Sequence, residues 1–158
     1  MGADNQQERL GASWIVGFTD GEGCFHVSIN RIPKMSLGWQ VLPEFRIVQH
    51  EKDESVLHRI KNYFGFGSIK INRKDHHGTR KEFRVRGLEN LNSIVNFFRD
   101  NKLNTSKIKD FEIFGEVIQL MNEKQHLTKK GLDKIAKLIS EMNRKPSLKY
   151  LESSETIR

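Results

Sequence analysis

One stretch near the N-terminus, residues 10–25, constrains the fold of this chain more than any other. Its apolar residues Leu10, Trp14 and Phe18 recur every four positions, which places them in one stripe on the surface of a helix. Acids and glycines follow directly, so we expect the helix to end there. Such an apolar helix has to be buried, and the rest of the chain is expected to pack around it.

A second stripe on the same helix consists of small residues, since Ser13, Gly17 and Gly21 also stand four positions apart. A glycine inside a helix destabilises it by roughly 0.8–1 kcal/mol relative to alanine. Two glycines on one ridge therefore indicate that another backbone approaches closely there. The expected partner is a second helix of the same kind.

Two carboxylates, Asp20 and Glu22, stand at the C-terminal end of this helix, each followed by a glycine. The helix dipole already concentrates negative charge at that end, so acids are unfavourable there unless a cation is bound. One interpretation is a buried helix followed by a solvated acidic turn. The other is a site for a divalent metal ion.

The nine residues 15–23, Ile-Val-Gly-Phe-Thr-Asp-Gly-Glu-Gly, resemble the signature of the LAGLIDADG homing endonucleases. Gly17, Asp20, Glu22 and Gly23 stand at its defining positions. The order of strands and helices, together with a later lysine, extends the resemblance over nearly the whole chain. The resemblance implies a site-specific endonuclease that cuts double-stranded DNA.

The length and composition suit one globular domain. The chain has 158 residues, of which 36% are hydrophobic, and this is enough for a sizeable core. No apolar run approaches the roughly 18 residues that span a membrane, and the N-terminus lacks the pattern of a secretion signal. Cys24 is the single cysteine, which excludes an internal disulfide. We expect one intracellular domain over 1–158, with its core at about 8–143 and a polar tail at 144–158.

Alternating apolar and polar residues predict four strands in two hairpins. The strands are expected at 24–30, 39–49, 68–72 and 82–86, with a polar turn at 73–80. Helices are expected at 53–65, 89–99, 107–121 and about 128–143. The order is αββαββα with appended C-terminal helices, an α+β fold in which helices pack on one face of a curved antiparallel sheet. Pro43 suggests an edge position or a bulge in the second strand.

The polar positions of the strands share the sheet face that the helices leave open. Arginine offers a fork to guanine, asparagine and glutamine pair with adenine, and glutamate accepts from cytosine, so this mixture is typical of base reading, although an ordinary solvated face is the plainer interpretation. The resemblance points to the same face and implies DNA contact there. The net charge of +7 also suits a polyanion. The residues on this face are His26, Ser28, Asn30, Gln40, Glu44, Arg46, Lys70, Asn72, Glu82, Arg84 and Arg86. In the expected turn, Lys74 and Arg80 are either solvated or contact phosphates.

The resemblance also assigns roles around the acidic end of the first helix. It implies that Glu22 is the metal-binding acid, that the carbonyl of Gly21 assists it, and that Asp20 serves the end of the helix. Magnesium prefers hard oxygen ligands. The implied cofactor is Mg²⁺, with Mn²⁺ or Ca²⁺ able to substitute for binding.

Two more polar residues match catalytic positions of the family by local alignment. Gln49, at the end of the second strand, matches a residue that orders water. Lys107 matches an active-site lysine that contacts water or the scissile phosphate, with Lys109 as the competing candidate. The plainer interpretation of either lysine is a surface residue at a helix start, although a cation at that positive helix end is unfavourable without a nearby anion.

The signature occurs once, so one chain supplies one helix ridge and one Glu22. Cutting both strands then requires a symmetric homodimer, packed through Ser13, Gly17 and Gly21, which prefers a palindromic or pseudo-palindromic site. An intron RNA maturase or splicing cofactor is the alternative function. A catalytically inactive DNA-binding module is the third, although Glu22 and Lys107 are both present. The resemblance adds an organelle, mitochondrion or chloroplast, as a candidate compartment.

Overall fold

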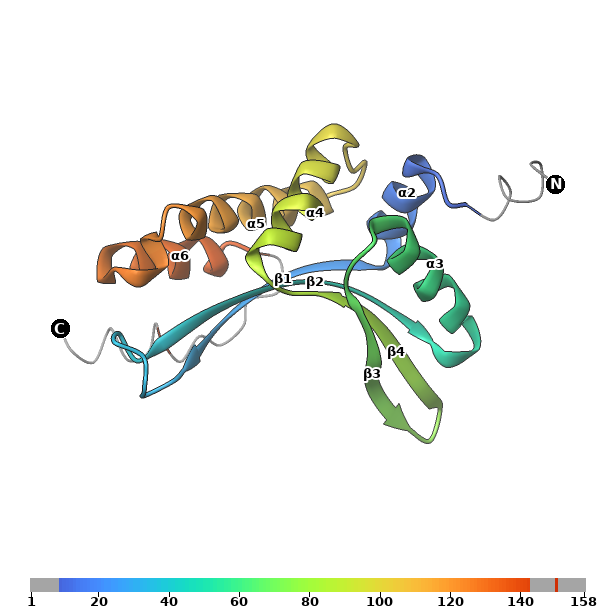
Figure 1. The fold of residues 1–158 in the computed structure, drawn as a ribbon, viewed down its shortest axis with the longest axis horizontal. Helices are drawn as coiled ribbons and strands as arrows, with labels where there is room; N and C mark the ends of the chain where they lie inside the picture. Colours follow the sequence, from blue (N-terminus) through green and yellow to red (C-terminus); the bar gives the residue numbers. More distant parts are fainter. Residues whose placement is uncertain (1–8, 143–149, 151–158) are drawn as a thin grey trace.

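Four antiparallel strands form a curved sheet, and the described helices lie on one side of it (Figure 1). The computed structural model describes residues 9–142 and residue 150. The strand order is β1-β2-β4-β3. The strands are β1 (Gly23–Arg31), β2 (Trp39–His50), β3 (Ser68–Asp75) and β4 (Gly78–Val85). Two hairpins are thus joined through β2 and β4, and the sheet bends away from the helices at both ends of the view in Figure 1.

The helices follow the predicted order, so the αββαββα fold with appended helices is confirmed. They are α2 (Ala12–Glu22), α3 (Glu54–Phe64), α4 (Leu88–Asp100), α5 (Lys107–Asn122) and α6 (Lys129–Ser140), with 3-10 turns η1 (Glu51–Asp53) and η2 (Gln125–Leu127). None of these described helices is long and apolar enough to cross a lipid bilayer. The expected polar tail, 144–158, lies outside the described residues apart from Tyr150.

Local signals set several helix ends as predicted. Gly65 ends α3 in the left-handed conformation, with φ at 81°. Thr128 caps α6, because its hydroxyl accepts a hydrogen bond from the backbone amide of Gly131 at 3.0 Å. Asp53, where this helix was expected to begin, precedes α3, and its side chain makes no capping hydrogen bond.

Phe25 lies at the centre of the core. Its ring centroid is 5.2–5.5 Å from those of Phe45, Phe98, Phe111 and Phe114, which come from β2, α4 and α5. Burying an aromatic side chain stabilises the fold by roughly 1.5–3 kcal/mol. Because Phe25 follows α2 by only three residues, this cluster fixes the end of α2 relative to α5.

The buried stripe of α2 differs from the predicted one. Ile15, Val16 and Thr19 face the core, with exposed fractions of 1%, 6% and 0%. Trp14 is 39% exposed and stacks on Phe18, with ring centroids 4.7 Å apart. The helix has one core-facing ridge, which these β-branched side chains occupy, so the large aromatic rings are left at its border.

The second hairpin is longer than predicted. Its strands stay paired up to Gly78, so the turn consists of residues 76–77 instead of 73–80. Gly78 has a φ of 115°, which glycine adopts without strain and which permits the tight reversal. Lys74 and Arg80 therefore lie in strands.

Pro43 lies in a part of β2 that is paired on one side only, so the expected edge position holds for this part of the strand. β2 is an internal strand, yet its pairing with β4 begins at Phe45. At Pro43 the strand pairs with Val27 of β1 alone. A residue without an N–H is tolerated there because one side of the strand carries no neighbour.

Candidate active site and nucleic-acid interface

Asp20 joins the end of α2 to the segment before α5. Its carboxylate accepts hydrogen bonds from the backbone amides of Asn104 at 2.9 Å and Thr105 at 3.1 Å, and from the Thr105 hydroxyl at 2.7 Å. Burial raises the pKa of Asp20, but these hydrogen bonds outweigh it and hold the pKa below its ordinary value. The carboxylate therefore fixes the chain that leads into α5 instead of serving its own helix.

Lys107 makes the return contact from α5 to α2. Its Nζ donates hydrogen bonds to the carbonyl oxygens of Thr19, at 2.9 Å, and of Gly23. The Thr19 carbonyl also accepts a hydrogen bond from the Gly23 amide. Carbonyls at the C-terminal end of a helix carry partial negative charge, so an ammonium group stabilises them. The structure thus brings Lys107 to the end of α2, whereas Lys109 is exposed.

Glu22 is the last residue of α2 and is exposed, as is Gly21. The chain then turns directly into β1 through Gly23, which is buried. A Cβ at Gly23 would lie 2.6 Å from Thr19 Cγ2 and 2.9 Å from the Thr19 carbonyl oxygen. The last glycine of the signature is therefore required sterically, and it sets the position of Glu22 at the junction of helix and strand.

The donor set at this junction suits a divalent ion. Within residues 9–142 and 150, no group of three or more His, Cys, Asp or Glu side chains could hold a metal. One chain offers the exposed carboxylate of Glu22 beside helix-end carbonyls such as that of Gly21. Mg²⁺ typically uses one or two carboxylates together with water and substrate phosphates. The residues present fit such an ion if water, phosphate or a second chain completes its coordination.

Gln49 lies near the same junction. The β1–β2 register ends where Gly23 pairs with Ile47, so Gln49 stands two residues beyond it on β2. The side chain is half-buried, and its amide donates to the carbonyl of Val48 at 2.8 Å. Lys107 is thus bonded to the end of α2, and Gln49 lies on the strand that pairs with Gly23, the residue directly after Glu22.

The strand register places most of the predicted DNA-contacting residues on the open sheet face. Cross-strand partners point to the same face. These partners are His26 with Glu44, Asn30 with Gln40, Arg46 with Arg84, and Lys70 with Glu82. Ser28 and Arg80 belong to the same face by strand alternation, and Asn72 and Arg86 join it through their contacts with Glu82 and Glu44. A register shift in β3 between Ile71 and Arg73 moves Lys74, the partner of Thr79, to the opposite face.

Two glutamates on this face are buried, contrary to the expectation of a solvated surface. Glu44 is 6% exposed and Glu82 is 5% exposed. Glu44 accepts a hydrogen bond from Arg86 Nε at 2.8 Å. Its other oxygen lies 3.4 Å from Arg46 Nε, an ion pair whose angle does not allow a hydrogen bond. Strand alternation identified the face but not the neighbours that cover these carboxylates.

The small stripe of α2 is exposed in the single chain. Ser13, Gly17 and Gly21 all face outward. A Cβ at either glycine would meet no other atom within 4 Å. Packing within the described chain therefore gives no reason for glycine at these two helical positions.

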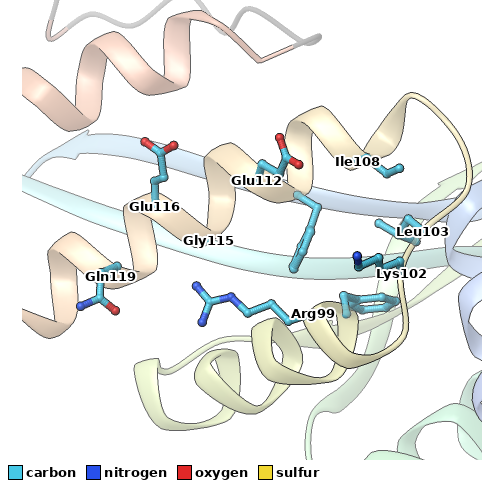
Figure 2. A pocket seen from close by; sticks show the side chains of 10 residues that line it. Arg99, Lys102, Leu103, Ile108, Glu112, Gly115, Glu116 and Gln119 are labelled. Atoms are coloured by element: carbon cyan, nitrogen blue, oxygen red, sulfur yellow. The ribbon is translucent and has the colours of Figure 1, made fainter.

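A groove of about 590 Å³ opens between α4 and α5, in the helical layer (Figure 2). Phe98, Leu103 and Phe111 are among the apolar residues that line it. Arg99 and Glu116 lie on its two opposing helices in Figure 2. None of the predicted site residues lines this groove, so it is separate from the candidate site.

Comparisons with known proteins agree with this geometry. The family model described as LAGLIDADG endonuclease matches residues 15–118. A probable intron-encoded endonuclease 2 of Neurospora crassa is 39% identical over 137 residues, which are 85% of this chain and 29% of that protein. This chain therefore spans less than a third of the length of that relative.

Two solved structures share the fold. The homing endonuclease I-TnaI superposes with a TM-score of 0.87 at 42% identity, covering 95% of this chain and 99% of that one. I-SmaMI, bound to an uncleaved DNA target in the presence of calcium ions, superposes with a TM-score of 0.86 at 33% identity. That match covers 93% of this chain and 49% of the I-SmaMI chain.

Proposed function

The chain belongs to the LAGLIDADG endonuclease family, and from this premise we propose that it is a homing endonuclease that cuts double-stranded DNA at a specific site. The observation that carries the proposal is the end of α2. There an exposed Glu22 lies between two fixed contacts, that of Asp20 with the segment before α5 and that of Lys107 with the carbonyls of Thr19 and Gly23. The concave, charged face of the sheet begins directly beside it.

The proposed chemistry is metal-dependent hydrolysis of a phosphodiester bond. Glu22 and the carbonyl of Gly21 would hold the ion, with Mg²⁺ as the cofactor and Mn²⁺ or Ca²⁺ as substitutes for binding. When bound, the ion activates water and stabilises charge on the phosphoryl oxygens. Gln49 orients the water, and Lys107 keeps a positive charge beside the phosphate. The presence of calcium ions with I-SmaMI on its uncleaved DNA target supports a divalent cofactor.

The proposed active form is a symmetric homodimer on a palindromic or pseudo-palindromic site. Ser13, Gly17 and Gly21 would let two α2 helices pack closely, which brings two copies of Glu22 to the two-fold axis. The exposed glycines without neighbours support this contact. So does the I-SmaMI chain, which is about twice as long as the part that this chain matches.

The catalytic assignment is tested with Glu22→Gln, which keeps the shape of the side chain and removes its charge. We expect the variant to bind a DNA target like the wild type but to cut none of it in Mg²⁺. Glu116→Gln, on the exposed side of α5, is the matched control and should cut normally. Normal cutting by Glu22→Gln would refute the site.

The dimer is tested with Gly17→Leu. Leucine favours helix formation over glycine, so the fold of the chain should not suffer. A branched side chain would nevertheless hold the two α2 helices apart, and we expect monomers in sedimentation equilibrium. Asn96→Leu, an exposed position of α4, should remain dimeric. A dimer of unchanged affinity in Gly17→Leu would mean that the interface lies elsewhere.

The alternative function is that of an intron RNA maturase. The Neurospora crassa relative is named as intron-encoded, and this name supports the alternative. It requires binding to intron RNA that survives loss of Glu22. An organellar location is also proposed, and the names of two relatives support it: a protein in ND4 intron 1 of Podospora anserina and a probable intron-encoded endonuclease Cox1-I1b of Schizosaccharomyces pombe.

A further inference from the structure

The same tripeptide, Glu-Phe-Arg, occurs in both central strands of the sheet. It is residues 44–46 in β2 and residues 82–84 in β4. Both phenylalanines are fully buried on the helix side, so the charged residues stand on the open face. Arg46 and Arg84 are direct cross-strand partners. Because the strands are antiparallel, the two glutamates flank this arginine pair from opposite sides.

This arrangement, which we call the Glu–Arg quartet (Glu44, Arg46, Glu82 and Arg84), combines two features that are unfavourable alone. Like charges directly opposite each other on a sheet repel. Buried carboxylates need partners, because burial removes their hydration. Glu82 lies 3.6 Å from Arg84 Nη1 and accepts a hydrogen bond from Asn72 at 3.5 Å. Together with the contacts of Glu44, these pairs offset the cost of burying the two carboxylates, although Arg46 Nε is itself buried without a hydrogen-bond partner.

Glu44 contacts the guanidinium groups of two arginines, each on its Nε side. Arg86 and Arg46 both approach it through Nε. Among the described residues, the terminal amino groups of these two arginines donate no hydrogen bond. Their side chains are 43% and 26% exposed, so these groups remain accessible. A side chain that is already ordered loses less conformational freedom when it binds.

We propose that Glu44 is a positioning residue, which orients Arg46 and Arg86 so that each half-site is read as neighbouring guanines. Arginine recognises guanine through its O6 and N7 atoms. The glutamates, being buried and already paired, do not read cytosine as the sequence pattern suggested. This assignment rests on the proposed DNA recognition by the open sheet face.

The test measures binding to a duplex library in which every position of the target is varied, with EDTA present. Glu44→Gln should weaken the guanine preference about tenfold at the same position that Arg46→Ala relaxes. The double variant should show no further loss, because both changes remove one coupled unit. Glu54→Gln, which removes a glutamate paired with Lys81 beside the helices, is the matched control and should keep the preference of the wild type.

A second measurement does not depend on DNA. In the free protein, the Arg86 Nε–H should exchange slowly with water by NMR and become fast in Glu44→Gln. Relaxation at a different, cytosine position, or additive losses in the double variant, would overturn the positioning role alone. An unchanged guanine preference of Glu44→Gln, or an unchanged exchange rate of the Arg86 Nε–H in that variant, would also overturn the positioning role. A wild type without any sequence preference would overturn the proposed DNA reading as well.

Discussion

Charged side chains serve different partners in the two functional regions of this molecule. At the end of α2, Asp20 binds backbone amides and Lys107 binds backbone carbonyls. On the open sheet face, the charged side chains bind one another, as in the contact of Glu44 with Arg86. The first kind of contact holds the backbone in place, and the second only orients side chains.

This difference matches what each region is proposed to do. Hydrolysis requires reacting groups at fixed positions, and small displacements slow it strongly. Recognition depends on which side chains the strands present, and these side chains can be replaced without changing the backbone of the strands. The end of α2 should therefore tolerate few changes, whereas changes on the sheet should alter which DNA is bound and leave the fold intact.

The largest effect is expected for Lys107→Met, which removes the ammonium group and retains most of the side-chain length. The carbonyls of Thr19 and Gly23 lose the ammonium group that binds both of them, and the phosphate loses a nearby positive charge. We expect the single-turnover cleavage rate at saturating DNA to fall by about 10²–10³-fold. Lys109→Met, at an exposed position of the same helix, should cut at the rate of the wild type. Equal cleavage rates for Lys107→Met and Lys109→Met would show that cleavage does not depend on the contact of Lys107 with the end of α2.

A smaller effect is expected for Arg84→Ala on the sheet. It should cost about 1–3 kcal/mol of binding free energy and relax base preference at one or two positions in each half-site. Arg80→Ala, at the exposed end of β4, should instead weaken binding to all sequences alike and reduce the salt dependence. Titrations of the library at several salt concentrations separate the two. If both variants lost binding affinity equally for all sequences of the library, the sheet face would bind DNA through its charge and not through base contacts.

The smallest effect is expected for Asp20→Asn. The amide accepts weaker hydrogen bonds, and we expect the free energy of unfolding to fall by about 0.5–2 kcal/mol, as for a lost helix cap. Because folding lowers the pKa of Asp20, its stabilisation is present above the unfolded pKa and is lost as pH falls through the folded pKa. Urea denaturation should therefore show the difference from the wild type shrinking in acid. Asp100→Asn, an exposed control, should leave stability near neutral pH unchanged.

The fold could be predicted where the signal is local. Gly65 and Thr128 set helix ends from their own conformations, and period-two alternation located the strands and their open face. The contacts at the end of α2 could not be predicted, because they join residues 84–88 positions apart. The burial of Glu44 was missed for a related reason, since alternation assigns a face but not the cross-strand neighbours on it. Lys74 was misplaced because a two-residue turn extended its strand and a register shift between Ile71 and Arg73 moved it to the opposite face.

The central claim is that this chain cuts DNA as a two-fold dimer through Glu22, and cleavage of a randomised duplex library tests it most directly. The purified protein is incubated with the library and Mg²⁺, and the cut ends are sequenced. We predict cut ends that share one site with two related half-sites, and their disappearance with EDTA or in Glu22→Gln. Cut ends without a common site, or the same ends from Glu22→Gln, would contradict this claim.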